Sequence, residues 1–203
     1  MPTSPAFALS LRTARRPWRA GACLLSLVCA LSACGDDDDE GNKGAAPGPA
    51  PNAACAPEKL ETDLMSMPFA GPGVDPATKA LALTPGTTYV VSSTYGVPKP
   101  GEDGASVSDR YQQLFGAVQT ELEAQPGLVA YQLASSPGCG SGRTLAVWKS
   151  EADMYAFVTA PAHLAAMNAV GEVLQPNYAV THWSASSPEA MTFAEGVRQI
   201  AAK

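Results

Sequence analysis

The stretch that decides the fold is AVWKSEADMYAFVTAPAHLAAM, residues 146–167. An apolar, strand-like run ends at Trp148. Ser150 followed by Asp153 then predicts a capping box, the usual start of a helix. Pro161 stands where a second helix begins, because its missing N–H is not needed in a first turn. The stretch therefore predicts a strand, a helix and a restarted helix.

The segments on either side of this stretch alternate between strand and helix patterns. Runs of β-branched and aromatic residues predict strands at 87–95, 128–134, 143–149 and 178–186. Helical spacing of apolar residues, preceded by the N-cap residue Ser108, predicts a helix over 108–124. The order strand, helix, strand, strand, helix, strand predicts an α+β fold, a ferredoxin-like βαββαβ domain.

The chain ends have other patterns. A C-terminal tail helix is expected with Pro188 in its first turn. Residues 57–85 show no clear periodicity, although EKLETDLMSM (58–67) is compatible with one short helix. We expect four parts: a signal peptide at 1–33, a tether at 34–56, an irregular extension at 57–85 and the ferredoxin-like domain at 86–203 with its C-terminal helix.

The N-terminus resembles the export signal of bacterial lipoproteins. Four arginines precede AGACLLSLVCAL (20–31), an apolar run too short for a permanent membrane span. LSAC (31–34) resembles a lipobox, which implies cleavage before Cys34 and acylation of that cysteine. The expected location is the bacterial cell envelope, where the protein is lipid-anchored to a membrane, on its periplasmic face or at the cell surface.

The charge of the expected mature chain excludes some partners. Removal of residues 1–33 leaves 9 basic against 19 acidic residues, five of them in DDDDE (36–40). An acidic chain of this kind does not predict a nucleic acid partner or charge-driven binding to anionic lipid. Residues 35–54 contain no large apolar side chain and predict a flexible tether. Membrane contact is expected through the lipid anchor on Cys34.

Two further cysteines remain in the mature chain, Cys55 and Cys139. Export to an oxidising compartment favours a disulfide between them, and two separate thiols are the alternative. The sequence contains no CxxC pair and no Cys/His cluster, so no metal site is expected.

Residues 144–167, TLAVWKSEADMYAFVTAPAHLAAM, resemble the antibiotic biosynthesis monooxygenase-like group of dimeric α+β barrels. The similarity extends over about 86–185. The positions that match the pattern of the group are Trp148, Ser150, Glu151, Phe157, His163 and Met167. The resemblance implies a homodimer in which two sheets close face to face. The partner would then cover the sheet face that the two helices leave free.

His163 is the candidate catalytic residue. It lies within the apolar arc of the second helix and in its first turn. Partial burial and the positive end of the helix dipole both favour a neutral imidazole, which can accept a proton from a substrate. The alternative is a partly buried histidine bonded to a carbonyl or a side chain.

The candidate substrate-binding residues are four aromatic side chains: Trp148, Tyr131, Phe157 and Tyr89. Flat aromatic compounds stack well on such rings. The alternative is ordinary core packing. His182 and Trp183 are expected on opposite faces of the last strand, because strand side chains alternate.

The first functional hypothesis is a cofactor-independent monooxygenase that acts on a small apolar or aromatic compound. It requires no cofactor and no metal, because the substrate itself supplies the electrons to oxygen. A haem-degrading activity is disfavoured, since Ser92 or Ser93, Phe157 and Met167 stand where such relatives carry other residues. The alternatives are a non-catalytic protein that binds a small apolar ligand and a dimeric interaction domain. Fold alone does not decide between them.

Overall fold

The computed structural model describes residues 54–101 and 107–203. The predicted signal peptide at 1–33, Cys34 and the tether up to residue 53 lie outside the described residues. In the described ranges, no helix is long and apolar enough to cross a membrane.

The elements follow the predicted order, with one added strand. The strands are β1 (Met65–Ser66), β2 (Tyr89–Gly96), β3 (Leu128–Ser136), β4 (Ser141–Trp148) and β5 (Ala179–Ala185). The helices are α1 (Asp109–Glu123), α2 (Glu151–Val158), α3 (Pro161–Asn168), α4 (Val170–Val173) and α5 (Phe193–Ala201). The tail differs from the prediction, because Pro188–Ala190 forms a short 3-10 turn and α5 begins only after the N-cap Thr192.

The sheet has the ferredoxin-like topology. Its strand order is β1-β3-β4-β2-β5, and every neighbouring pair is antiparallel. The connection through α1 joins β2 to β3 across β4, and the connection through α2 and α3 joins β4 to β5 across β2. These two interleaved crossovers define the split βαβ unit.

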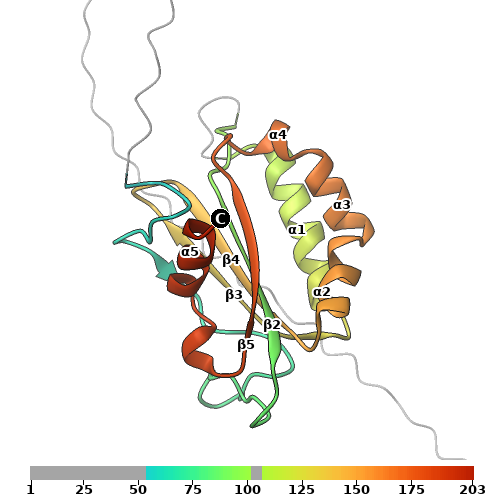
Figure 1. Ribbon diagram of the computed structural model, residues 1–203. Coiled ribbons are helices and arrows are strands. Elements are labelled where there is room, and N and C mark those ends of the chain that lie inside the picture. Colours follow the sequence, from blue (N-terminus) through green and yellow to red (C-terminus); the bar gives the residue numbers. More distant parts are fainter. Residues whose placement is uncertain (1–53, 102–106) are drawn as a thin grey trace, which may run out of the picture. The chain divides into compact units, whose positions relative to one another are not determined.

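One face of the sheet carries the helices (Figure 1). Figure 1 shows α1, α2, α3 and α4 together on one side, with α5 and the teal N-terminal segment on the other. The core between helices and sheet contains Leu122 and Leu128 together with Trp148, Met154 and Phe157. This side matches the expected arrangement.

The other face is covered by the chain itself. Strand residues with side chains on this side, such as Val91, Leu145 and Val147, are 0% exposed within the single chain. The side chains that pack against this face from the N-terminal segment are Leu64, Phe69, Val74, Leu81 and Leu83, and from the C-terminal part Met191 and Phe193. The expectation of a face left free for a partner is therefore not met, because residues 55–85 and α5 occupy it.

Residues 55–85, hereafter the strap, form no helix. The short strand β1 pairs with β3, with Met65 opposite Ser135 and Ser66 opposite Ala134. The strap therefore extends the sheet at the β3 edge before it crosses the face. Its bonds to β3 join residues that are far apart in the sequence, and its local bonds form turns, such as those around Asp75, so this part of the sequence has no periodic pattern.

Candidate functional site

Trp148 forms the base of the predicted site. It is the last residue of β4, is 0% exposed and faces the helices. Its indole Nε1 donates to the Ser92 hydroxyl of β2 at 3.0 Å. Phe157 of α2 stacks on the indole with ring centroids 5.3 Å apart. Ser150 places α2 after the strand, because its hydroxyl accepts from the Asp153 amide as predicted.

His163 completes this aromatic stack, which we define as Trp148, Phe157 and His163. Its ring meets the Phe157 ring edge-on at 4.8 Å. Its Nδ1 lies 3.0 Å from the Val158 carbonyl oxygen. Because a carbonyl can only accept, Nδ1 carries the proton and Nε2 keeps an acceptor lone pair.

The His163 imidazole is neutral at pH 7. Burial lowers its pKa below the ordinary value of 6.5, and the bond to the Val158 carbonyl and the charge of Glu121 oppose this shift in part. Desolvation disfavours the charged form of any buried base. A neutral, half-buried imidazole agrees with the expected protonation state, and its bond to a carbonyl agrees with the alternative of a structural histidine.

Glu121 of α1 is a residue that the sequence reasoning missed. Its carboxylate accepts from the backbone amides of Ala162 at 2.9 Å and His163 at 3.1 Å. The N-cap of α3 is Ala160, which has no side chain able to cap. Glu121 therefore caps α3 from another helix and orients His163. The sequence contains one signal for this contact. Ala160, directly before Pro161, cannot cap the helix with its side chain, so the first amides of α3 need a partner from elsewhere in the chain.

Tyr131 of β3 lies on the same face but has its own partners. Its hydroxyl donates to Glu123 at 2.5 Å, and the Gln119 amide donates to the same hydroxyl at 3.4 Å. Burial and the bond to the Glu123 carboxylate raise the pKa of the Tyr131 phenol, and the Gln119 bond acts against them. Tyr131 packs against the cluster that contains Trp148 and Phe157.

The structure does not bring Tyr89 to the other candidate residues. Val90 is the residue of β2 that pairs with Trp148, so Tyr89 and Trp148 point to opposite faces of the sheet. The Tyr89 hydroxyl accepts from the Thr84 amide at 3.0 Å, on the strap side. The prediction that Tyr89 lines a pocket together with Trp148 is therefore wrong. The strand alternation expected for His182 and Trp183 holds, with Trp183 buried and His182 exposed.

Trp148 and Phe157 of the aromatic stack are buried, at 0% and 9% exposed. Two hollows, of about 320 and 390 Å³, lie along the strap, one beside Cys139 and one beside Phe69. The part of the chain that the structure describes contains no group of three or more His, Cys, Asp or Glu side chains arranged to hold a metal ion.

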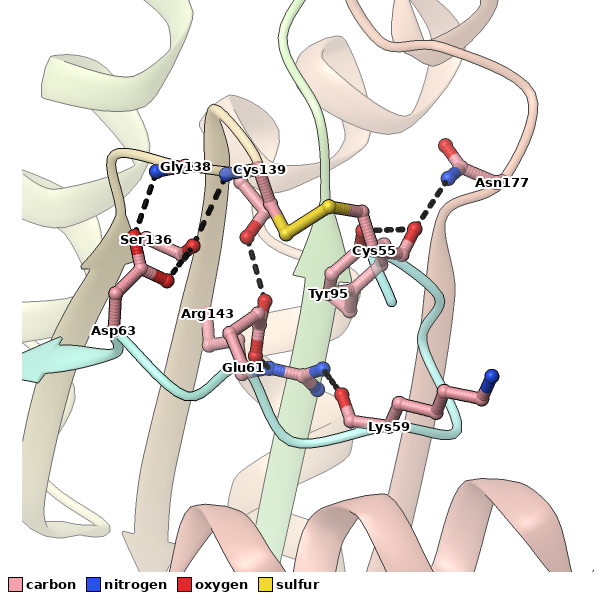
Figure 2. Close-up of a disulfide and its surroundings, with 11 residues drawn as sticks. Cys55, Lys59, Glu61, Asp63, Tyr95, Ser136, Gly138, Cys139, Arg143 and Asn177 are labelled. Atoms are coloured by element: carbon pink, nitrogen blue, oxygen red, sulfur yellow. Dashed lines mark hydrogen bonds and ion pairs between the residues drawn. A yellow bond between two sulfur atoms is a disulfide. The ribbon is translucent and has the colours of Figure 1, made fainter. Parts of the chain in front are cut away.

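The two cysteines lie at the strap, on the face opposite to the aromatic stack. Cys55 and Cys139 are joined by a disulfide that links the start of the strap to the β3–β4 turn. Figure 2 shows this bond above the buried pair of Glu61 and Arg143. Of the two possibilities left open by the sequence, a disulfide or two thiols, the structure contains the disulfide.

The chain is similar to one known family over part of its length. The family model described as antibiotic biosynthesis monooxygenase matches residues 102–169, about a third of the 203 residues. The match includes α1, β3, β4, α2 and α3, and hence the aromatic stack. No match is found among the curated proteins.

Several solved structures are similar to about half of the chain. Rv0793 from Mycobacterium tuberculosis is 23% identical, with a TM-score of 0.41, and the similarity covers 47% of this chain and 92% of that one. SnoaB, a cofactor-independent oxygenase from Streptomyces nogalater, is 17% identical, with a TM-score of 0.36 and coverage of 49% and 92%. A dimeric ferredoxin-like protein from Thermobifida fusca is 17% identical, with a TM-score of 0.40 and coverage of 51% and 96%. The ferredoxin-like fold is defined by the strand order and the two crossover connections.

Proposed function

We propose that this chain is a lipid-anchored protein of the bacterial cell envelope whose ferredoxin-like domain is a cofactor-independent monooxygenase for a small aromatic compound. The observation that supports it is the contact of His163 Nδ1 with the Val158 carbonyl oxygen at 3.0 Å. A neutral ring with Nδ1–H held by Val158 presents Nε2 as a proton acceptor at the N-terminus of α3.

The place for the substrate is the face of α3 that carries His163 and Met167. These residues are four positions apart and share one face of the helix. Met167 is 42% exposed and supplies a thioether that packs well against an aromatic ring. A phenolic substrate on this face would meet the acceptor nitrogen of His163 with its hydroxyl.

The reaction needs a substrate that is itself the reductant. Nε2 takes the phenolic proton, and the resulting anion donates electrons to O2. In the net reaction of a phenol, the ring C–H para to the hydroxyl becomes a carbonyl and the phenolic carbon becomes the second carbonyl of a quinone. One oxygen atom of O2 enters the product, and the other leaves as water with the ring hydrogen and the phenolic hydrogen. The protein contributes the proton acceptor and the orientation of the substrate.

The experiment compares the two histidines of the chain. Oxygen uptake and 18O incorporation are measured with a panel of polycyclic phenols that carry a free ring C–H para to the hydroxyl. His163→Ala is expected to lower turnover by about 10²–10⁴-fold, the usual contribution of a positioned general base. His182→Ala, an exposed strand residue, serves as the matched control and keeps full activity. Equal activity of the two variants would remove the role of His163.

A second candidate function is favoured by the closed packing of the stack. The predicted pocket residues Trp148 and Phe157 fill the space between helices and sheet with their own rings. This packing supports a non-catalytic envelope protein that binds an apolar ligand on the surface of α3 or acts as an interaction domain. A compound from the panel that binds the full chain, remains unconsumed and binds His163→Ala equally well would favour this candidate.

The lipid anchor has its own test. Residues 12–34 support it by their order of arginines, apolar run and lipobox-like LSAC. Cys34→Ser is expected to abolish labelling by radioactive palmitate and to move the protein from the membrane to the soluble fraction. Cys139→Ser, a cysteine outside the lipobox, is the control that keeps the label. Membrane attachment of Cys34→Ser would refute acylation at this position.

A further inference from the structure

Arg143 is a buried cation on a sheet face that is largely apolar. It lies near the start of β4, and its side chain is 1% exposed. Its Nε donates to the Glu61 carboxylate at 2.7 Å, and its terminal nitrogens donate to the carbonyls of Pro57 at 3.3 Å and Lys59 at 2.7 Å (Figure 2). In the part of the chain that the structure describes, the hydrogen-bond acceptors of this guanidinium therefore come from one short segment, residues 55–63.

Two buried hydroxyls lie beside this cation. The Ser141 hydroxyl, on a residue that is 3% exposed, donates to the second oxygen of Glu61 at 2.6 Å. The centroid of the Tyr95 ring lies 4.6 Å from the guanidinium carbon, and the Tyr95 hydroxyl donates to the Cys55 carbonyl at 3.0 Å. Burial and, after it, the charge of Glu61 raise the pKa of Tyr95, while the charge of Arg143 opposes them, so the phenol stays protonated. Tyr95, Ser141 and Arg143, hereafter the donor patch, thus surround one positive charge with O–H and N–H donors.

Glu61 shows which chemical group fits the donor patch. Its Oε2 accepts from the Arg143 Nε, and its Oε1 accepts from the Ser141 hydroxyl. Its side chain is 0% exposed, so these bonds form without competition from water. Hydrogen bonds from a charged donor to a carboxylate are about twice as strong as bonds between neutral groups. A carboxylate is therefore the ligand class that the donor patch recognises, whether it belongs to the chain or to a small molecule.

Residues 55–63 cover the donor patch and not the apolar part of the sheet face. The strap pairs with β3 only from Met65 onward, and Leu64 is the first strap residue that packs against the apolar cluster of this face. The strap side chains from Leu64 to Leu83, together with Met191 and Phe193, cover that cluster. Residues 55–63 can therefore leave the donor patch while the apolar residues stay covered.

This segment is held at its start, in its middle and at its end. The Cys55–Cys139 disulfide fixes the start, and the donor patch binds Glu61 in the middle. At the end, the Asp63 carboxylate accepts from the Gly138 amide at 2.7 Å. The disulfide is the covalent attachment, so its redox state decides how freely Glu61 can leave the donor patch.

We propose that the donor patch is a binding site for a small carboxylate, that Glu61 occupies it while the disulfide is intact, and that reduction of the disulfide opens it to an external carboxylate. With the bond intact, Glu61 is tethered beside the patch at a high effective concentration, and an external carboxylate competes poorly. With the bond reduced, the segment leaves only when a carboxylate replaces Glu61 on Arg143, because a buried cation without a partner is strongly unfavourable. Reduction and ligand binding are therefore coupled.

The reduction requires a dithiol. One of its thiolates attacks the Cys139 sulfur, the S–S bond breaks, and Cys55 leaves as a thiolate that takes up a proton. The second thiolate attacks the resulting mixed disulfide and releases Cys139, which takes up the other proton. The dithiol ends as a disulfide, and the two protons and two electrons that it loses appear on the two cysteines.

The test measures the binding of acetate to the full chain by titration calorimetry, with the disulfide intact and after reduction by dithiothreitol. Acetamide, an uncharged molecule of similar size, is the control ligand. Glu61→Ala empties the donor patch without reduction. Because Glu61 lines the hollow of about 320 Å³ beside the strap, its removal joins this hollow to Arg143. Asp63→Ala removes a strap carboxylate that bonds to Gly138 instead of Arg143 and is the matched control variant.

We expect the affinity for acetate to be at least about tenfold higher in the reduced wild-type chain than in the oxidised one. The oxidised Glu61→Ala variant should bind acetate as well as the reduced wild-type chain does. Oxidised Asp63→Ala, and Glu61→Leu combined with Arg143→Met, should bind it no better than the oxidised wild-type chain. Acetamide should bind to none of these proteins.

A loss of stability in Glu61→Ala does not remove the test. A ligand that binds only the folded chain raises its urea midpoint. Acetate should therefore raise the midpoint of Glu61→Ala more than that of Glu61→Leu with Arg143→Met, which controls for the effect of salt. Equal shifts in these two variants would overturn the carboxylate site. A reduced, folded wild-type chain that binds acetate no better than the oxidised chain would overturn the control of this site by the disulfide.

Discussion

Substitution of Glu61 by alanine tests how much the strap depends on its buried ion pair. The Glu61 side chain is 0% exposed and accepts from Arg143 at 2.7 Å and from the Ser141 hydroxyl at 2.6 Å. Removal of one partner leaves a buried positive charge without compensation, which costs about 3–5 kcal/mol. We therefore expect Glu61→Ala to lower the free energy of unfolding by this amount.

The assay is urea unfolding of the oxidised chain, followed by near-UV circular dichroism. With an m-value of about 2 kcal/mol/M, the loss shifts the midpoint by roughly 1.5–2.5 M. Glu172→Ala, an exposed glutamate of α4, is the control and should shift the midpoint very little.

A second pair of substitutions separates the charge from the packing. Glu61→Leu combined with Arg143→Met replaces the ion pair by apolar side chains, and such replacements are often neutral or stabilising. The double variant should recover most of the stability that Glu61→Ala loses. A loss below about 1 kcal/mol for Glu61→Ala would refute the reasoning, because Arg143 would then have to reach water in the folded chain.

Four further predictions concern other parts of the molecule. Gly71→Ala should destabilise the chain, because the added Cβ would lie 2.8 Å from the Ala130 Cα. Gly116→Ala in α1 adds a Cβ with no atom within 4 Å and should stabilise the chain by about 0.5–1 kcal/mol. Thermal unfolding measures both effects. Replacement of both bonded cysteines by serine should lower the free energy of unfolding by about 4.5 kcal/mol, from the loop entropy of a bond with a sequence separation of 84, as read from the urea midpoint. The free energy of unfolding should fall as pH decreases through 6.5, because the pKa of His163 is lowered in the folded state and the unfolded chain takes up the proton first. His163→Gln should remove this dependence in urea titrations at pH 5–7.5. Glu121→Gln should cost about 0.5–2 kcal/mol and increase hydrogen exchange at the first amides of α3, and unchanged exchange would contradict its capping role.

The ferredoxin-like core could be predicted because its signals are local. The apolar residues that predict α1 lie within that helix. Ser150 and Pro161 lie at the first turns of α2 and α3, the helices that they predict. The alternation of Trp183 and His182 likewise follows from strand geometry alone. Element order then determines the topology, since few arrangements satisfy the handedness of the two crossovers.

The site and the strap depend on pairings that a single sequence does not contain. Tyr89 and Trp148 are both strand aromatics, and only the register, which pairs Trp148 with Val90, shows that they point to opposite faces of the sheet. Glu121 caps α3 by bonds to Ala162 and His163, which lie 41 and 42 positions further along the chain. One signal for the strap was present. Arg143, Leu145 and Val147 are alternate residues of β4, so their side chains share one face of the sheet. An arginine on this apolar face predicts a buried acidic or carbonyl partner elsewhere in the chain.

The central claim, that the strap rather than a second subunit covers the sheet, is tested most directly by hydrogen exchange of the oxidised full chain. The amides to follow are Met67, Ala70 and Gly73, which bond to the β3 edge. We predict slow exchange at all three, with rates that do not change between dilute and concentrated protein. Fast exchange at these amides, together with protection of the sheet that grows with protein concentration, would contradict the account.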